Sequence, residues 1–388
     1  MTLTRRELAK LAGIAAAIGI TDKTMAQSDS RSEIDSPGPD NTEVRLFGDG
    51  IGLAPTEYTQ LLNSLCQEAD IEEDNYLLGG EVEKFEQYCA NLLGKEMAVF
   101  LPSGTLANQL ALRQLAGSRR RVIVPGLSHV YNDTGDASQN LSSLNLIPLA
   151  GDRADFTLEE VQAILDRTAS GRVTAEVGAI LVENPVRRLS GEMVDWNETR
   201  RITEFAREND IGTHLDGARL FIASAYTGIS PAEYAEPFDT VYFSLWKYFN
   251  SNIGAILAGP RSRLENMYHT RRMFGGNLFM GWPSALVARF YMEGFTERFQ
   301  NAINVSETFY RAIESVPGLE ITRIPNGTNV ARLRISGTDI SAFRNRLAAE
   351  NIRVGNPNAE GLISLGVNET WSRISGERLA EAFVRALG

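Results

Sequence analysis

A lysine stands among apolar and aromatic residues in the segment DTVYFSLWKYFNSNIGAILAG, residues 239–259. Lys247 is at its centre, and lysine is rarely buried because its ammonium needs water or a partner. The lysine could run its stem along apolar surface or pair with a carboxylate. Alternatively, burial could keep its amine neutral, because desolvation lowers the pKa of an ammonium and the free amine is a nucleophile.

Other polar residues follow segments that we expect to be strands. Ser103, Gly104 and Thr105 come after the apolar run EMAVFL. Free backbone N–H groups at such a strand-to-helix turn can bind an anion, although a simple helix cap has the same pattern. His129 comes just after RRVIVPG, where it could be structural or functional.

A carboxylate and a guanidinium come next, in the segment HLDGARLF. Asp216 ends a predicted strand, and Arg219 follows within one turn. Asp216 could be a hydrogen-bonded carboxylate or a helix cap, or it could hold a basic ring nitrogen in its protonated form. Arg219 could neutralise Asp216 or bind another anion. Ser244 lies three residues before Lys247.

Taken together, these residues meet the demands of one cofactor. Pyridoxal phosphate needs a phosphate cradle, a flat residue that stacks on its ring, a carboxylate for its ring nitrogen and a lysine for a Schiff base. Ligands of open α/β sheets bind beyond the carboxyl ends of the strands, where these residues are expected. We therefore expect pyridoxal phosphate, bound through Lys247.

The elements that must position these residues alternate from about residue 77. Strand-like runs at 96–104, 120–126, 144–150, 176–184, 210–220 and 240–247 are separated by segments with helical spacing of apolar residues. The helix after Thr157 opens with a capping box that Glu160 completes. This alternation predicts an α/β fold with a mostly parallel sheet covered by helices. After about residue 300 the order changes and indicates a smaller α+β domain.

The first 26 residues are typical of an export signal. Arg5 and Arg6 are paired, a short apolar stretch follows, and small residues precede Gln27. This order predicts a twin-arginine signal peptide at 1–26, with a periplasmic location, and an amphipathic first helix is the alternative. The apolar stretch is too short to span a membrane, so we expect no stable membrane association. Residues 27–44 are polar with two prolines and indicate a linker.

Composition argues against several classes of function. The 388 residues are 43% hydrophobic, enough for one large or two medium domains. A net charge of −11 argues against nucleic acid as a partner. Three histidines and two cysteines, Cys66 and Cys89 in helical-looking segments, do not predict a metal site. Whether the two cysteines pair is left open.

The chain resembles the fold-type I pyridoxal phosphate enzymes, most closely the low-specificity threonine aldolases of the β-eliminating lyase superfamily. The segments LPSGTLANQLAL, HLDGARLF, RRMFGGNLFMGW and VENPVRRLSGEMV carry the resemblance. It covers about residues 45–295 and the C-terminal part more loosely. It implies a transferase-like fold with a seven-stranded sheet, a large domain at 45–295 and a small one at 296–388. It also implies a homodimer or homotetramer, because active sites in that family form between subunits.

The resemblance implies roles for individual residues. Phosphate contacts fall to Ser103, Gly104, Thr105 and Ser244, ring contacts to His129, Asn184, Asp216 and Arg219, and the covalent bond to Lys247. Within this set Asp216 pairs with the ring nitrogen and Arg219 lies near the phenolic oxygen. His129 stacks on the ring and could help in proton transfer.

Two departures from the resemblance concern the substrate carboxylate. The segment LFGDG places Gly48 and Asp49 where the family has Arg-Ser-Asp, whose serine helps to bind that carboxylate. Ser364 stands close to the position of the family's carboxylate-binding arginine. Losing a bidentate contact between an arginine and the substrate carboxylate removes a strong orienting interaction. The candidates for substrate binding in this chain are Asp49, Arg272 and Arg353.

The lysine motif departs as well, since Trp246 and Tyr248 flank Lys247 where Ser-Lys-Gly is usual. The cofactor residues are therefore kept while the substrate residues differ. The leading hypothesis is a pyridoxal phosphate-dependent lyase that cleaves a β-hydroxy-α-amino acid to glycine and an aldehyde, with His129 or a water that it holds as the base. The alternatives are β-elimination, transamination or racemisation with the same cofactor, and a cofactor-binding homologue with little turnover.

Overall fold

A seven-stranded sheet lies at the centre of the computed structural model, which describes residues 42–68 and 70–388. Its strands in spatial order are β2 (Met97–Leu101), β8 (Ala255–Gly259), β7 (Thr240–Ser244), β6 (Gly212–Asp216), β5 (Val177–Glu183), β3 (Arg121–Pro125) and β4 (Asn145–Leu149). All neighbours are parallel except where β8 pairs with β2 and β7. The predicted mostly parallel sheet of seven strands is confirmed. The predicted signal peptide and most of the predicted linker lie outside the described residues.

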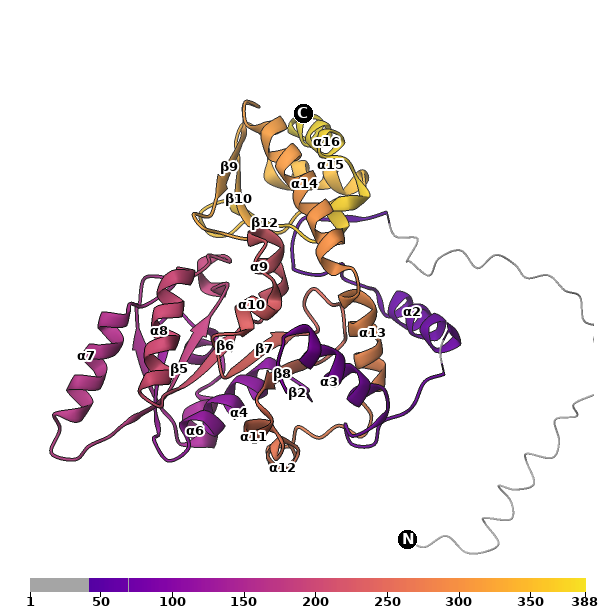
Figure 1. The fold of residues 1–388 in the computed structure, drawn as a ribbon. Helices are drawn as coiled ribbons and strands as arrows, with labels where there is room; N and C mark the ends of the chain where they lie inside the picture. Colours follow the sequence, from indigo (N-terminus) through magenta and orange to yellow (C-terminus); the bar gives the residue numbers. More distant parts are fainter. Residues whose placement is uncertain (1–41, 69) are drawn as a thin grey trace, which may run out of the picture. The chain divides into compact units, whose positions relative to one another are not determined.

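Helices cover both faces of this sheet, so its strands are apolar on both sides (Figure 1). In β5, Ala179 and Leu181 pack with residues of α4 (Gly104–Ala116), whereas Ile180 and Val182 join a second core on the opposite face. Successive side chains of a strand point to opposite faces, which explains the unbroken apolar run VGAILV. On the face opposite α4, α8 (Trp196–Glu208) packs against β6.

The remaining helices of this part of the chain connect the strands. They are α2 (Pro55–Glu68), α3 (Gly80–Leu92), α5 (His129–Asn132), α6 (Ala137–Ser142), α7 (Leu158–Ala169), η1 (Arg187–Leu189), α9 (Leu220–Thr227), α10 (Pro231–Ala235), α11 (Arg261–Leu264), α12 (Met267–Met273) and α13 (Trp282–Met292). The predicted capping box opens α7, where Thr157 and Glu160 exchange hydrogen bonds of 3.3 and 2.8 Å. Cys66 on α2 and Cys89 on α3 are free thiols. No helix among the described residues is long and apolar enough to cross a membrane.

A smaller antiparallel sheet follows near the C-terminus, as predicted. Its order is β12 (Leu362–Gly366), β10 (Val330–Ile335) and β9 (Leu319–Arg323), and its helices are α14 (Phe295–Ile313), α15 (Ile340–Ala349), η2 (Glu369–Arg373) and α16 (Gly376–Leu387). Along β10 the buried Ala331 and Leu333 alternate with the exposed Arg332 and Arg334. One face of the sheet therefore packs on the helices, and the other is polar.

The chain's N-terminal segment joins this second core. β1 (Val44–Arg45) pairs in parallel with β11 (Ile352–Arg353), and Val44 and Leu46 pack among the C-terminal residues. A two-residue strand whose partner is some 300 positions away leaves no local pattern in the sequence. The predicted division at residues 45 and 295 remains a prediction.

Candidate active site

Lys247 lies three residues beyond the end of β7, whose five residues are all buried. Burial, and next the charge of Arg219, lower the pKa of Lys247 to about 8, although Asp216 and Asp49 act in the opposite direction. The ring centroid of Trp246 lies 5.2 Å from Nζ, and Trp246 is half-exposed. A good part of the Lys247 amine is therefore neutral and nucleophilic near pH 8.

The chain contains only five lysines, and three of them lie in the described part. Hydrogen bonds with Glu81 and then Glu72 raise the pKa of Lys84, which keeps its amine protonated. Burial lowers the pKa of Lys95, but its amine donates to the backbone oxygen of Phe238 at 2.6 Å, at the opposite edge of the sheet. Lys247 is thus the described lysine that combines a lowered pKa with a place at the carboxyl ends of the parallel strands.

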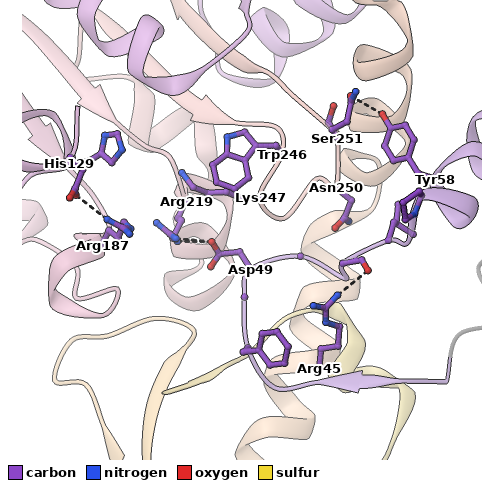
Figure 2. Close-up of a pocket in the computed structure, with 18 of the residues that line it drawn as sticks. Arg45, Asp49, Tyr58, His129, Arg187, Arg219, Trp246, Lys247, Asn250 and Ser251 are labelled. Carbon is purple, nitrogen blue, oxygen red and sulfur yellow. Dashed lines mark hydrogen bonds and ion pairs between the residues drawn. The ribbon is translucent and has the colours of Figure 1, made fainter. Parts of the chain in front are cut away.

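A cavity of about 1080 Å³ opens beside Lys247 (Figure 2). Of the residues predicted for the site, it is lined by Asp49, His129, Arg219 and Lys247. They come from segments far apart in the sequence: the N-terminal segment, the ends of β3 and β6, and the end of β7. The volume accommodates a cofactor together with a small substrate.

His129 stands at the start of α5 and lines this cavity. Its backbone N–H donates to Oε2 of Glu183 at 2.6 Å, and Ser128 caps the helix by accepting from the Tyr131 N–H. Burial, partly offset by Asp216, lowers the pKa of His129. The imidazole is therefore neutral at pH 7 and is able to accept a proton.

Asp216 ends β6 and belongs to a buried chain of hydrogen bonds. Its carboxylate accepts from Asn108 Nδ2 at 2.6 Å and from the Ala218 N–H at 3.1 Å. Asn108 Oδ1 lies 2.8 Å from His214 Nε2, and His214 Nδ1 lies 2.8 Å from the Thr240 hydroxyl. Burial lowers the pKa of His214 to about 4, so its ring is neutral. Because an amide oxygen only accepts, the His214 proton resides on Nε2 and the hydroxyl donates to Nδ1.

The predicted phosphate cradle lies at the start of α4. Ser103 caps this helix, since its hydroxyl accepts from the Leu106 N–H at 3.3 Å, so the cap expected as the simpler alternative is present. The N–H groups of Gly104 and Thr105 have no acceptor among the described residues. Two free donors at the positive end of a helix suit a phosphate.

The same turn lies against β7. A Cβ atom at Gly104 would overlap the hydroxyl of Tyr242, so only glycine fits at this position. The buried Ser244 hydroxyl lies beside that of Tyr242 without a hydrogen bond of ordinary geometry. This unsatisfied hydroxyl and the two free N–H groups fit an anionic group. None of these residues lines the large cavity, but β7 connects them with Lys247.

Asn184 also stays outside the cavity. Its side-chain oxygen accepts from the Val194 N–H at 3.2 Å, and its backbone N–H donates to the carbonyl of Asp216 at 3.0 Å. These bonds fix the turn after β5. Asn184 therefore stabilises this turn and does not line the cavity.

Arg219 and Asp49 form an ion pair on the cavity wall. Arg219 Nε and Nη2 lie 3.0 and 2.8 Å from the same oxygen of Asp49, whose other oxygen is 3.4 Å from Asn329 Nδ2. Burial acts to lower the pKa of Arg219. The negative charge of Asp49 and its bond with Arg219 have the larger combined effect, so this pKa is raised. Asp49, predicted as a substrate contact, is thus engaged with a second predicted site residue.

The other predicted substrate residues lie elsewhere in this chain. Arg272 on α12 lies over the ring of Tyr76 and donates to the hydroxyl of Tyr268 at 3.3 Å, and Arg353 pairs with Glu43 at 3.0 Å. Neither arginine lines the cavity. Ser364 on β12 stands opposite Arg332 of β10. This arginine is more than 30 positions away, and the sequence did not predict that the two residues are neighbours.

Comparison with known proteins places the chain in a family. The model of the beta-eliminating lyase family matches residues 56–335. The chain belongs to this family. It is 31% identical over 220 residues to the low-specificity L-threonine aldolase of Candida albicans, covering 56% of this chain and 57% of that protein. It is 30% identical over 210 residues to alanine racemase TOXG of Cochliobolus carbonum, covering 53% of this chain and 52% of that protein. The chain thus spans little more than half the length of these curated relatives.

A solved structure agrees over a longer range. The protein from Exiguobacterium sp. 255-15 named as an aromatic amino acid β-eliminating lyase/threonine aldolase superposes with a TM-score of 0.74 at 28% identity, over 89% of this chain and 96% of its own. The fold is therefore that of the fold-type I enzymes, and the cofactor of this family is pyridoxal phosphate. The predicted fold class, family and cofactor are confirmed.

Proposed function

We propose that this protein is a pyridoxal phosphate-dependent lyase that cleaves a β-hydroxy-α-amino acid to glycine and an aldehyde. The observation that carries the proposal is Lys247, an amine with a pKa of about 8 on the wall of a large cavity. The buried carboxylate of Asp216 at the adjacent strand end and the neutral ring of His129 support it. So does the similarity to a low-specificity L-threonine aldolase.

The surroundings of each site residue indicate its proposed role. The cofactor, when bound, supplies an electron sink for the bond that breaks at the substrate's Cα. Asp216, held by Asn108, would accept a hydrogen bond from the ring nitrogen and keep it protonated. The free N–H groups of Gly104 and Thr105 would hold the phosphate. Lys247 would hold the cofactor covalently.

His129 would take the proton from the substrate's β-hydroxyl. Its lowered pKa leaves the imidazole neutral at pH 7, which a proton acceptor requires. It lines the same cavity as Lys247, so its ring lies on the wall of the space that the proposed substrate would occupy.

The assay is direct. Protein loaded with pyridoxal phosphate is incubated with L-allo-threonine, L-threonine and phenylserine, and glycine and aldehyde are quantified, with Lys247→Ala as the blank. We expect equal amounts of glycine and aldehyde from at least one of these substrates. Absence of glycine from every β-hydroxy amino acid tested would refute the aldolase proposal.

Racemisation is the second candidate, because one relative of 30% identity is named an alanine racemase. Both reactions break a bond at Cα, and what holds the substrate decides which bond breaks. L-Alanine incubated with the holoenzyme and analysed on a chiral column separates the two candidates. D-Alanine without any glycine from L-allo-threonine would favour the racemase.

We further propose that the protein self-associates, as its family suggests. Tyr76, Leu78, Phe279 and Met280 are large apolar side chains that are exposed. Tyr76 and Phe279 stack edge to face with ring centroids 5.4 Å apart, so the two segments form one surface. Large exposed apolar surfaces mark interaction sites. Sedimentation velocity should show a dimer or tetramer, and a monomer at micromolar concentration would contradict this proposal.

Export by the twin-arginine route is also proposed, on the order of residues at 1–26. In cells that have this pathway, the full chain should appear in the periplasmic fraction in a shortened form. Replacing both Arg5 and Arg6 by lysine should retain it in the cytoplasm at full length. Export that is unaffected by the double replacement would contradict the proposed route.

A further inference from the structure

Among the described residues three arginines line the cavity, and they differ in how their charges are balanced. Arg219 places two nitrogens on Asp49, at 2.8 and 3.0 Å. Arg45 donates to the backbone oxygen of Gly52 at 2.9 Å and lies 3.9 Å from Glu43. Arg187 is the third, and half of its side chain is exposed to the cavity and solvent.

The guanidinium of Arg187 shares its only carboxylate partner among the described residues with the guanidinium of Arg188. Asp133 accepts from Arg188 at 2.6 and 3.3 Å through two nitrogens and from Arg187 at 3.0 Å through one. The bond with Arg188 lowers the pKa of Asp133, so this side chain remains a carboxylate. Asp133 can balance only one of the two guanidinium charges. Nε and Nη2 of Arg187 have no acceptor among the described residues.

The backbone fixes Arg187 beside His129. Glu183, buried at the end of β5, accepts from the His129 N–H at 2.6 Å through one oxygen and from the Arg187 N–H at 2.9 Å through the other. The charge of Arg187 is also one of the influences that lower the pKa of His129. Figure 2 shows Arg187 and His129 next to each other at the left of the view, with Arg219 and Lys247 to their right, and all four line the cavity.

We propose that Arg187 binds the carboxylate of the amino acid substrate. The inference rests on the proposed function, since it assumes an amino acid in this cavity. Gly48 lines the cavity without offering a side chain, and Ser364 is exposed on β12 outside it, so neither position supplies the expected contact. Two free guanidinium nitrogens match the two oxygens of a carboxylate.

Arg188 provides a matched control. It pairs with the same Asp133 but does not line the cavity. The test compares Arg187→Gln, Arg187→Lys and Arg188→Gln in the full-length holoenzyme. Binding of glycine is titrated through the change in cofactor absorbance, and methylamine, which has an amine but no carboxylate, is titrated in parallel.

We expect Arg187→Gln to weaken glycine binding about 10- to 100-fold, the range for a charged hydrogen-bonded contact, and to leave methylamine binding within about twofold. Arg187→Lys should recover part of the loss, and Arg188→Gln should bind glycine within about twofold of the unaltered protein.

Three results would overturn the proposal: unchanged glycine binding in Arg187→Gln, equal weakening of glycine and methylamine, or an equal loss in Arg188→Gln. Glycine that fails to bind the unaltered holoenzyme would overturn it too. Glycine binding does not need cleavage. A protein that binds glycine through Arg187 yet releases no aldehyde would therefore refute only the proposed aldol reaction.

Discussion

Capture of pyridoxal phosphate by the cofactor-free protein should rise with a midpoint near pH 8, well below the pH at which an ordinary lysine becomes neutral. The reaction needs the neutral amine of Lys247, whose pKa burial and the charge of Arg219 lower to about 8. Because the pKa is lowered, the reactive form is populated above about pH 8 and is lost as the pH falls below it.

The size of the effect follows from the two pKa values. At pH 7.5 an amine with a pKa of about 8 is roughly one quarter neutral, against about one part in a thousand for an unperturbed lysine. The capture rate at pH 7.5 should therefore exceed that of a solvent-exposed lysine with equal intrinsic reactivity by roughly 200-fold.

Arg219→Gln is the informative perturbation. It removes the second-largest cause of the lowered pKa, and it frees Asp49, which acts to raise the pKa of Lys247. If the pKa of Lys247 rose by one unit, about one thirtieth of the amine would be neutral at pH 7.5. Capture would then be roughly eightfold slower. Arg45→Gln is the control, because Arg45 lines the same cavity but is not among the causes of the shift.

The assay is stopped-flow absorbance of the apoprotein mixed with pyridoxal phosphate from pH 6 to 10. The midpoint of the rate profile is the readout, since weaker cofactor binding alone changes the amplitude. A midpoint near 10 in the unaltered protein would refute the reasoning about burial. A midpoint that moves down in Arg219→Gln, or moves equally in Arg45→Gln, would refute the part assigned to Arg219.

Two further predictions concern packing near the site, and a third concerns the exposed apolar surface proposed for self-association. Gly104→Ala should abolish cofactor retention, measured by absorbance after gel filtration, because its Cβ would overlap Tyr242; retention at the unaltered level would contradict the packing. His214→Phe should cost about 1–3 kcal/mol in urea unfolding, because it leaves Asn108 Oδ1 without its buried donor, and no loss would contradict the hydrogen-bond chain. Phe279→Glu should shift the protein towards monomers in sedimentation velocity, and an unchanged assembly would place the interface elsewhere.

The sequence predicted the sheet and the residues at its carboxyl edge because both leave local patterns. Buried parallel strands are short apolar runs between helices, and each polar residue that follows such a run falls at the edge where ligands bind. Asp49, His129, Arg219 and Lys247 were found in this way or by resemblance, and they line one cavity.

Contacts between distant segments could not be predicted. Asp49 and Arg219 pair across 170 positions, and Asn108 and Asp216 pair across 108 positions. Residue spacing in the sequence does not predict contacts over such separations. His214 did leave a signal, since residues two apart on a strand share a face and His214 precedes Asp216 by two. Arg187 left no such signal in the sequence. Its place beside the cavity depends on hydrogen bonds with Asp133 and Glu183 in the folded chain.

The central claim is that Lys247 carries the cofactor, and it can be tested directly because the chain has only five lysines. The holoenzyme is treated with sodium borohydride, which reduces an imine to a stable amine, then digested and mapped by mass spectrometry. We predict the pyridoxyl phosphate mass on the peptide that contains Lys247 and on no other. The label on Lys84, Lys95 or another lysine, or no labelled peptide from coloured protein, would contradict the account.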